Sequence, residues 1–353
     1  MQRAYILEPG TYLRKSGPNI ALVRGKKVVE EFALEGLQQL TLTGYTSLSG
    51  AVIRELIKHR VETVLLNGRG RFEGRISIDE HKHIQRRRAQ YIKLSDQTIL
   101  LKTARDIVLG KLKTQARFLN LRGHKMGKES LLSWGMAITA LAKQVAEVKA
   151  DKGMLLVRGM EGHGARLYFQ AFPHLMSNPL FSFTGRNRRP PLDPVNALLS
   201  FVYTLLTNEV LTAIKRVGLD PYLGSLHEPA YGRPSLACDL VEEWRVFLGD
   251  RLILGLLNRK TIHPDDFVYR QVPNTDYVDE KDLKSKRPVE MKPGICRAFV
   301  KSYEEWMNKQ ILVPETNRHS TYRGLILDQA RLFERYLLGE IPAYTPFDWS
   351  HQR

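Results

Sequence analysis

The sequence predicts an α+β protein, with a small amino-terminal β-rich domain followed by a larger all-α domain. In residues 1–94, short apolar runs alternate with Gly and Pro residues that favour turns, which is typical of strands. In residues 95–353, apolar residues recur at the spacing of one helix face. A chain of 353 residues is also too long for one small core, so two domains are expected.

The amino-terminal domain is predicted to consist of strands joined by tight turns, with one short helix among them. Pro9-Gly10 and Gly17-Pro18 separate the first apolar runs, because these dipeptides favour turns. A short capped helix is expected over residues 47–59, where serines precede an apolar pattern. The predicted strands are residues 4–7, 12–13, 20–23, 27–29, 40–43, 61–66 and 72–78.

The carboxy-terminal domain is predicted to be helical over most of its length. Asp193 is expected to cap one helix, with Pro194 at its first position, because this order favours a helix start. Residues 272–291 are charged and contain Pro273 and Pro288, which indicates a loop or a short hairpin. The predicted helices are residues 98–119, 128–148, 160–172, 200–217, 239–257 and 321–338.

The chain is strongly basic. It has 54 Lys and Arg residues against 37 Asp and Glu residues, which gives a net charge of +17 at pH 7. Such a surface favours a phosphate-rich partner, since binding releases counterions from nucleic acid. Either the protein binds nucleic acid, or it is a basic cytosolic protein whose charge has no such role.

The sequence argues against several other classes of protein. Cys238 and Cys296 are the only cysteines and form no Cys-x-x-Cys pair, so neither a zinc knuckle nor a disulfide framework is indicated. The first residues lack the apolar segment of a signal peptide. No run approaches the roughly 18 uncharged apolar residues of a transmembrane helix. A soluble, cytoplasmic protein without a membrane partner is therefore expected.

Residues 224–245 carry the strongest chemical signal. His227 lies on a Gly- and Pro-rich loop, and Asp239 and Glu242 follow on a predicted helix. Residues three positions apart share a helix face, so the carboxylates and the imidazole could surround a divalent cation. The residues around the two carboxylates are apolar, which predicts that the carboxylates are buried and need a partner. The alternatives are a solvated charged face and an ion pair between Glu242 and Arg245.

A further carboxylate, Glu161, is predicted at the start of the helix over residues 160–172. Gly162 and Gly164 beside it permit close approach of another backbone or a ligand. Glu161 is either a metal ligand or an ordinary first-turn carboxylate that favours a helix N-terminus. Oxygen ligands with one imidazole favour Mg²⁺ or Mn²⁺ over zinc. Such an ion can activate a hydroxyl and stabilise charge on a phosphodiester.

A basic loop precedes the helix that Asp193 is expected to cap. Arg186, Arg188 and Arg189 lie on this Pro-bounded loop and could grip backbone phosphates of DNA. The alternative is a solvated basic loop. Asn196 lies inside an apolar helix start, where a buried amide needs partners, and we group it with these arginines as a DNA-binding residue.

Five motifs occur in a fixed order along the chain. They are Asn-Gly-Arg-Gly-Arg-Phe-Glu-Gly from residue 67, Arg-Pro-Pro-Leu-Asp-Pro-Val-Asn from residue 189, Gly-Leu-Asp-Pro-Tyr-Leu-Gly-Ser-Leu-His from residue 218, Gly-Arg-Pro-Ser-Leu-Ala-Cys-Asp-Leu-Val-Glu from residue 232 and Tyr-Thr-Pro-Phe from residue 344. Together they resemble the CRISPR-associated spacer-acquisition integrase and endonuclease family, the first-numbered CRISPR-associated protein. The resemblance covers most of the chain, and the ordered set is more specific than any single motif.

The resemblance implies roles for particular residues. The family's metal-binding glutamate falls on Glu161, its metal-binding histidine on His227 and its final metal-binding carboxylate on Glu242. An auxiliary acid falls on Asp239, and a basic residue used near the scissile phosphate falls on Arg245. Many relatives carry aspartate at the position of Glu242.

The resemblance also implies a function in CRISPR adaptation. A metal-dependent DNA endonuclease and integrase is expected, which joins the 3′-hydroxyl ends of short duplex DNA (protospacers) into the CRISPR array by transesterification. The implied partners are double-stranded and branched DNA, a second copy of the chain that pairs through residues 1–94, and a small companion, the second-numbered CRISPR-associated protein. The alternatives are a non-catalytic scaffold that binds double-stranded DNA and, less favoured by the basic charge, a phosphodiesterase acting on RNA or small nucleotides.

Overall fold

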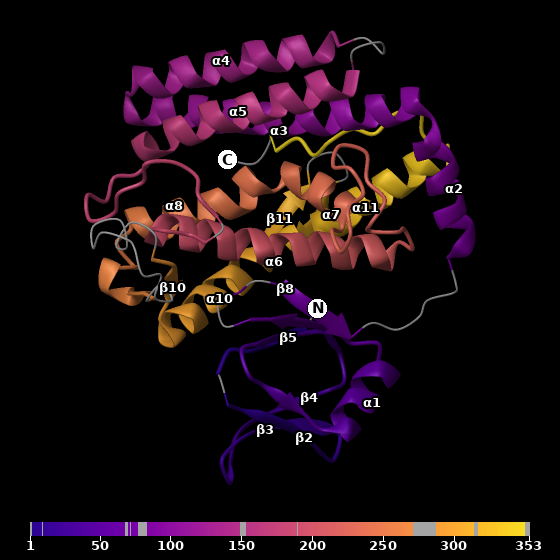
Figure 1. Cartoon of the computed structure of the whole chain (residues 1–353), viewed down its shortest axis with the longest axis vertical. Coiled ribbons are helices and arrows are strands. Elements are labelled where there is room, and N and C mark those ends of the chain that lie inside the picture. The colour runs from indigo at the N-terminus through magenta and orange to yellow at the C-terminus, as the bar shows by residue number, and fades with distance from the viewer. Residues whose placement is uncertain are drawn as a thin grey trace, which may run out of the picture. The chain divides into compact units, whose positions relative to one another are not determined.

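The computed structural model describes residues 2–8, 10–67, 70, 72–76, 83–148, 153–188, 190–270, 287–313 and 317–349 (Figure 1). The chain divides into two compact units. The first comprises Met1–His81 with Glu290–Ser302, and the second comprises Lys82–Val289 with Tyr303–Arg353. The first unit is rich in strands and the second is mostly helical, so the predicted fold class is confirmed.

The first unit contains two four-stranded sheets. One has the strand order β1-β5-β7-β8, in which β1, β5 and β7 are parallel and β8 is antiparallel to β7. The other has the order β4-β3-β2-β6, in which β2, β3 and β4 form an antiparallel meander. The strands are β1 (Gln2–Ile6), β2 (Tyr12–Ser16), β3 (Asn19–Arg24), β4 (Lys27–Ala33), β5 (Leu37–Thr43), β6 (Ser47–Leu48), β7 (Glu62–Leu66) and β8 (Phe72–Ile76).

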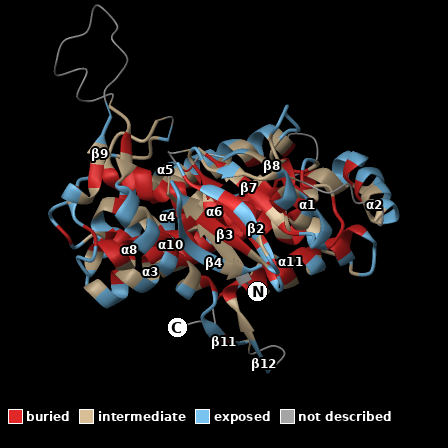
Figure 2. Cartoon of the chain, turned by 90° about the horizontal axis from the view of Figure 1, so that it is seen from below, coloured by how far each residue is buried: buried red, intermediate tan, exposed pale blue. Residues whose placement is uncertain are grey.

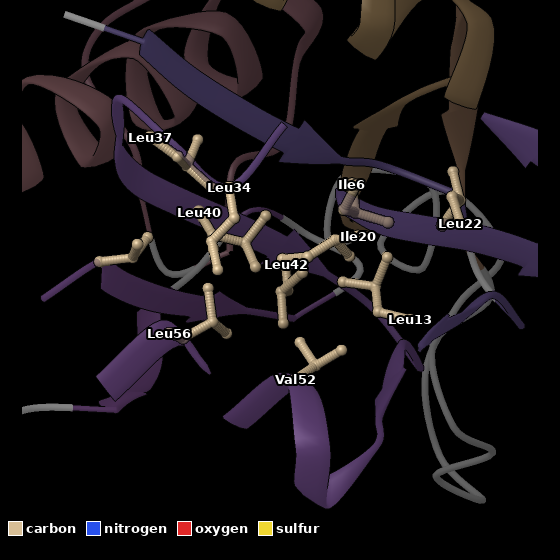
Figure 3. Close-up of a cluster of buried hydrophobic side chains, with 11 residues drawn as sticks. Ile6, Leu13, Ile20, Leu22, Leu34, Leu37, Leu40, Leu42, Val52 and Leu56 are labelled. Carbon is tan, nitrogen blue, oxygen red and sulfur yellow. The ribbon is translucent and has the colours of Figure 1, made fainter. Parts of the chain in front are cut away.

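Aliphatic side chains from both sheets form the core of this unit. Leu13 and Ile20 of one sheet and Leu40 of the other are at most 1% exposed and belong to one cluster (Figure 3). Helix α1 (Gly50–Lys58) adds Val52 and Leu56 to the same cluster. The Ser49 hydroxyl caps α1 by accepting a hydrogen bond from the Val52 amide at 3.2 Å, so the predicted short capped helix is confirmed.

The second unit is built from long helices. Helices α3, α4 and α5 lie side by side at the top of Figure 1, and α6 packs against α7, η3 and α11. The burial of each element can be followed in Figure 2. The helical elements with residues in this unit are α2 (Ile84–Ser95), α3 (Gln97–Met126), α4 (Glu129–Ala146), α5 (Gly153–Leu175), α6 (Pro194–Arg216), α7 (Ser235–Leu240), η2 (Val241–Glu243), η3 (Arg245–Asp250), α8 (Arg251–Asn258), η4 (Pro264–Asp266), α10 (Pro293–Met307) and α11 (Tyr322–Leu337). The remaining strands in the described part of the chain are β9 (Phe267–Tyr269), β10 (Val289–Met291), β11 (Gln310–Val313) and β12 (Arg318–Thr321).

Helix α2 belongs to the second unit, whereas the sequence placed its residues before a boundary at residue 94. Its buried Gln90 explains this assignment. The Gln90 side-chain amide donates to the carbonyl oxygens of Asp220 and Leu223, both at 2.9 Å. Its carbonyl oxygen accepts from the Asp220 amide at 2.8 Å, so every polar atom of this side chain binds the second unit.

Helix α6 begins with the predicted cap residue and proline. Asp193 accepts a hydrogen bond from the Asn196 amide at 2.8 Å, and Pro194 occupies the first turn. Helix α6 is long and apolar enough to cross a membrane by length and composition, but 72% of that apolar window is buried inside the protein. It therefore has the character of a core helix.

The segment predicted as one helix over residues 239–257 is not a single α-helix, and that prediction was wrong. Helix α7 ends at Leu240, a 3₁₀ turn covers Val241–Glu243, a π-helical segment covers Arg245–Asp250, and α8 follows. Changes of helical pitch alter the direction in which successive side chains point. Glu242 and Glu243, which are consecutive residues of the 3₁₀ turn, contact different partners. Of the loop or short hairpin expected over residues 272–291, residues 272–286 lie outside the described residues, and Val289–Met291 form a strand that pairs with Phe267–Tyr269.

Candidate active site

Two of the predicted metal ligands meet at one buried ammonium group. Lys111 on α3 forms ion pairs with Glu161 on α5 and with Glu242 on η2, the latter at 2.8 Å between Nζ and Oε2. The Lys111 side chain is 7% exposed and the Glu242 side chain is 2% exposed. Residues from three separate helical elements therefore place two carboxylates around a single cation.

Glu161 does not lie in a first turn, so that interpretation of its role was wrong. Helix α5 begins at Gly153, which places Glu161 about two turns inside it. Gly164 lies one turn after Glu161, and a Cβ atom added there would collide with Leu112 of α3. The absence of that side chain lets α5 approach α3 closely, and this approach brings Glu161 to Lys111. Gly162 has open space around its Cβ position and makes no such contact.

Glu242 is an ionised carboxylate in a buried setting. Burial alone raises the pKa of Glu242, but the positive charges of Arg245 and Lys111 outweigh burial and lower the pKa below its usual value. Arg245 Nη1 lies 2.9 Å from Glu242 Oε1. Among the described residues, Oε2 of Glu242 has no hydrogen-bond partner and only the ion pair with Lys111. This oxygen retains lone pairs that could bind a metal ion.

His227 is held by Asp239. The carboxylate of Asp239 is fully buried and accepts hydrogen bonds from the backbone amides of Ser225, Leu226 and His227 at 2.6, 3.0 and 2.9 Å. Its Oδ1 also lies 2.7 Å from Nδ1 of the His227 ring. A Cβ atom at Gly224 would collide with Asp239, so the loop can approach this carboxylate only with glycine there.

This arrangement separates the roles of the two carboxylates that were predicted to share a helix face. Asp239 binds the loop and orients the imidazole, while Glu242 points to Lys111 and Arg245. A proton on Nδ1 directed at Asp239 leaves Nε2 of His227 as the ring atom able to bind a ligand. The His227 side chain is 32% exposed, so that atom is within reach of solvent or substrate.

The residues present fit a divalent cation, although they do not surround one as they stand. In the described part of the chain, no group of three or more His, Cys, Asp or Glu side chains is arranged to hold a metal ion. Lys111 lies between two of the carboxylates, and His227 is close enough to Glu242 to be among the groups that lower the pKa of that carboxyl group, after Arg245 and Lys111. Two hard oxygen ligands and an imidazole nitrogen suit Mg²⁺ or Mn²⁺.

Arg245 belongs to a buried network that the sequence did not reveal. Its guanidinium lies over the ring of Tyr203 at 5.1 Å. The hydroxyls of Tyr203 and Tyr168 donate to the two oxygens of Asp250 at 2.7 and 2.8 Å. Burial raises the pKa of Asp250 to about 6, against the lowering effect of these hydrogen bonds. The network fixes Arg245 beside Glu242.

The structure gives Asn196 a role inside the basic loop rather than at a DNA surface. Asn196 is fully buried. Its amide nitrogen donates to the Gly185 carbonyl at 2.8 Å and to Asp193 at 2.6 Å. Its oxygen accepts from the Asn187 amide at 3.0 Å and from Arg186 at 2.7 Å. These contacts satisfy the buried amide and set the course of the loop.

The three arginines of this loop differ in their surroundings. Arg186 also donates to the Ser200 hydroxyl at 3.1 Å, and its guanidinium lies 5.5 Å from the centre of the Tyr203 ring. Burial lowers the pKa of Arg186, and its contacts direct it into the protein. Arg188 is exposed and free to meet a phosphate from the surface. Arg189 lies outside the described residues.

The carboxy-terminal motif, residues 344–347, contacts the two residues that follow Glu242. Glu243, next to Glu242, accepts hydrogen bonds from the Tyr344 hydroxyl and from the Phe347 amide, the latter at 2.7 Å. Phe347 stacks on Trp244 with ring centres 4.6 Å apart. Burial raises the pKa of Glu243 to about 7. The motif from residue 344 therefore braces the turn that presents Glu242.

Comparison with known proteins identifies the family. A sequence model described as CRISPR associated protein Cas1 matches residues 4–284. The chain is 34% identical over 345 residues to "CRISPR-associated endonuclease Cas1 3" of Thermus thermophilus, covering 97% of this chain and 96% of the relative. It is 33% identical to "CRISPR-associated endonuclease Cas1 1" of Chlorobaculum tepidum, covering 98% and 97%. A Cas4/Cas1 fusion from Geobacter sulfurreducens is 32% identical over 97% of this chain and 59% of the fusion.

Solved structures share the fold. A Cas1 protein from Thermotoga maritima superposes with a TM-score of 0.78 at 24% identity, over 96% of this chain and 97% of that one. A casposase bound to its integration product superposes with a TM-score of 0.80 at 22% identity, over 99% and 95%. The match of the family model to most of the chain, together with relatives above 30% identity over nearly its full length, shows that this chain belongs to the Cas1 family of CRISPR-associated proteins.

Proposed function

We propose that this protein is a metal-dependent DNA endonuclease and integrase of CRISPR adaptation. In this proposal it joins the 3′-hydroxyl ends of short duplex DNA into the CRISPR array by transesterification. The observation that carries the proposal is the meeting of Glu161 and Glu242 at one buried cation, close to the exposed His227 ring. The names of the relatives, which are CRISPR-associated endonucleases, support the same reaction class.

The metal would be held by Glu161, Glu242 and Nε2 of His227. A bound Mg²⁺ or Mn²⁺ ion would supply Lewis-acid chemistry, by activating an attacking hydroxyl and stabilising charge on the phosphate. Asp239 keeps the proton on Nδ1 of His227 and so keeps Nε2 available as a ligand. The ionised state of Glu242 suits this role, because a carboxylate ligand must be deprotonated.

Arg245 is proposed to bind the scissile phosphate. Its guanidinium is fixed by Glu242 on one side and by the Tyr203 ring on the other. The Arg245 side chain is 25% exposed, so part of the guanidinium can donate to non-bridging phosphate oxygens. In the strand-transfer step, the 3′-hydroxyl oxygen forms a bond to phosphorus while the target phosphodiester bond breaks. The released 3′-oxygen takes up a proton, and the number of phosphodiester bonds is unchanged.

The proposed partners follow from charge and from the relatives. A net charge of +17 favours duplex and branched DNA, and the exposed Arg188 is proposed to contact the DNA backbone together with Arg189. One structure with the same fold is titled "Cas6-RT-Cas1--Cas2 complex", and the chain covers 36% of that longer chain. On this basis we propose a small Cas2 companion. A homodimer formed through residues 1–94 is proposed from the family resemblance alone.

The competing function is a DNA-binding scaffold without catalysis. The complete set of Glu161, His227 and Glu242 favours catalysis, because a scaffold has no use for a buried carboxylate such as Glu242, whose pKa neighbouring charges lower, near a histidine. Cleavage and strand transfer of branched DNA, assayed with Mn²⁺ and with EDTA, separate the two. We expect metal-dependent products from the wild type, and none from Glu242→Gln although duplex binding is retained. Binding without any metal-dependent product from the wild type would establish the scaffold.

A further inference from the structure

We propose that Lys111 is the resident counter-cation of the Glu161–Glu242 pair and competes with the divalent ion for these two carboxylates. The inference rests on the proposed function, because it concerns the same site. Lys111 is a positioning residue in this proposal: in the metal-free protein it holds the carboxylates together, and when metal enters its ammonium moves away.

Lys111 is paired with both carboxylates. A buried ammonium is stable only when it is paired, and here both of its partners are proposed metal ligands. Without Lys111, the carboxylates of Glu161 and Glu242 would repel one another across a short distance in a largely buried setting. The ammonium therefore stabilises, without metal, the geometry that a metal ion requires.

The charges at the site make the Lys111 ammonium and a divalent ion competitors for the same two carboxylates. Glu161 and Glu242 bring two negative charges, and Lys111 and Arg245 bring two positive charges. A divalent ion added to this balanced set would create an excess of positive charge beside the ammonium. Metal binding is therefore favourable only as the ammonium withdraws.

A second acceptor for the ammonium lies on the same helix. Gln115 is one turn after Lys111 on α3 and is 3% exposed. Its carbonyl oxygen Oε1 is buried and has no hydrogen-bond partner among the described residues. The same oxygen lies 3.7 Å from the Cβ position of Gly164, so it faces α5 on the side that carries Glu161. A buried acceptor without a partner is costly, and the displaced ammonium would satisfy it.

The test uses the full chain and Mn²⁺ as the probe. Lys111→Met removes the charge but keeps the length of the side chain, and the exposed Lys113→Met on the same helix is the matched control. In EDTA, we expect Lys111→Met to melt several degrees below the wild type, because two carboxylates lose their partner. In a Mn²⁺ titration followed by electron paramagnetic resonance, we expect Lys111→Met to bind about tenfold more tightly than the wild type, or about 1.4 kcal/mol. Lys113→Met should match the wild type in both measurements.

The outcomes distinguish this inference from the proposed function. If the wild type binds Mn²⁺ and Lys111→Met binds it no more tightly, the competition is refuted while the metal site stands. If neither protein binds Mn²⁺, the metal site itself is refuted. Gln115→Leu provides a second test should Lys111→Met fail to fold, since it leaves Lys111 in place. Removal of the second acceptor should weaken Mn²⁺ binding, and unchanged binding would overturn the proposed movement.

Discussion

Asp239→Asn tests whether one carboxylate holds the loop that presents His227. Each oxygen of Asp239 accepts two short contacts: Oδ2 from the amides of Ser225 and Leu226, and Oδ1 from the amide and the ring of His227. Asparagine has the same shape, but its amide nitrogen cannot accept a hydrogen bond. If the new amide nitrogen faces Ser225 and Leu226, both of those contacts are lost. If it faces His227, the contact with the backbone amide is lost and the contact with the ring must reverse its direction.

The expected cost follows from these contacts. A hydrogen bond to a charged group contributes about 1.5–3 kcal/mol, so the loss of one or two such bonds gives a destabilisation of about 1.5–6 kcal/mol. The change also acts on the imidazole. If the new amide nitrogen faces His227, Nδ1 becomes an acceptor and the ring proton moves to Nε2, which can then no longer bind a metal ion.

Urea unfolding measures the loss of stability, and hydrogen exchange at the amides of residues 225–227 reports whether Asp239 holds the loop. We expect the free energy of unfolding to fall by the stated amount and these amides to exchange much faster. Asp328→Asn is the control, because Asp328 forms only surface ion pairs with Arg318 and Arg331 and should change stability by at most about 1 kcal/mol. If Asp239→Asn matches this control and the loop amides stay protected, Asp239 does not hold the loop.

Three further predictions follow from the structure. Burial raises the pKa of Glu243 from 4.5 to about 7 in the folded protein, so folding favours its protonated form. This contribution to stability is fully present below pH about 4.5, and about 3 kcal/mol of stability is lost as pH rises through 7. Urea unfolding at pH 5 and pH 8 should show that Glu243→Gln reduces this loss, and an unchanged pH dependence would contradict the assignment. Gly164→Ala should destabilise the protein by about 1–3 kcal/mol, because the new methyl group collides with Leu112. Gly162→Ala has open space and should be neutral or stabilising by up to about 1 kcal/mol. Equal effects of the two substitutions in thermal unfolding would refute this difference. Arg188→Ala should weaken duplex binding and reduce the salt slope by about 1, whereas Arg186→Ala should mainly lower the melting temperature; the reverse pattern would show that Arg186 is the DNA contact.

Much of the fold could be predicted because its signals are local. Ser49 and Asp193 cap their helices through contacts with residues three positions away, and Pro194 fixes the first turn of α6. Such contacts depend only on neighbours in the sequence. The break in the helix over residues 239–257 was not predicted, because its apolar spacing fits an α-helix and the change of pitch arises from partners elsewhere in the chain.

The sequence indicated the three candidate metal ligands but not the lysine that lies between two of them. The sequence pointed to Glu161, His227 and Glu242, and the burial of Asp239 and Glu242 followed from their apolar neighbours. Lys111 escaped notice because a lysine in a helical pattern is ordinarily solvated. Its contacts depend on how α3, α5 and η2 pack, which no local pattern reveals. The inward course of Arg186 was hidden for the same reason, whereas the burial of Asn196 followed from its apolar neighbours.

The central claim is that Glu161, His227 and Glu242 bind one divalent ion. The most direct test is anomalous diffraction from a crystal of the full chain soaked in Mn²⁺. We predict one anomalous peak that lies about 2.1 Å from a carboxylate oxygen of Glu161, from one of Glu242 and from Nε2 of His227. The Lys111 ammonium should be withdrawn from both carboxylates. A crystal at saturating Mn²⁺ that shows no peak there, with Lys111 still paired to Glu161 and Glu242, would contradict it.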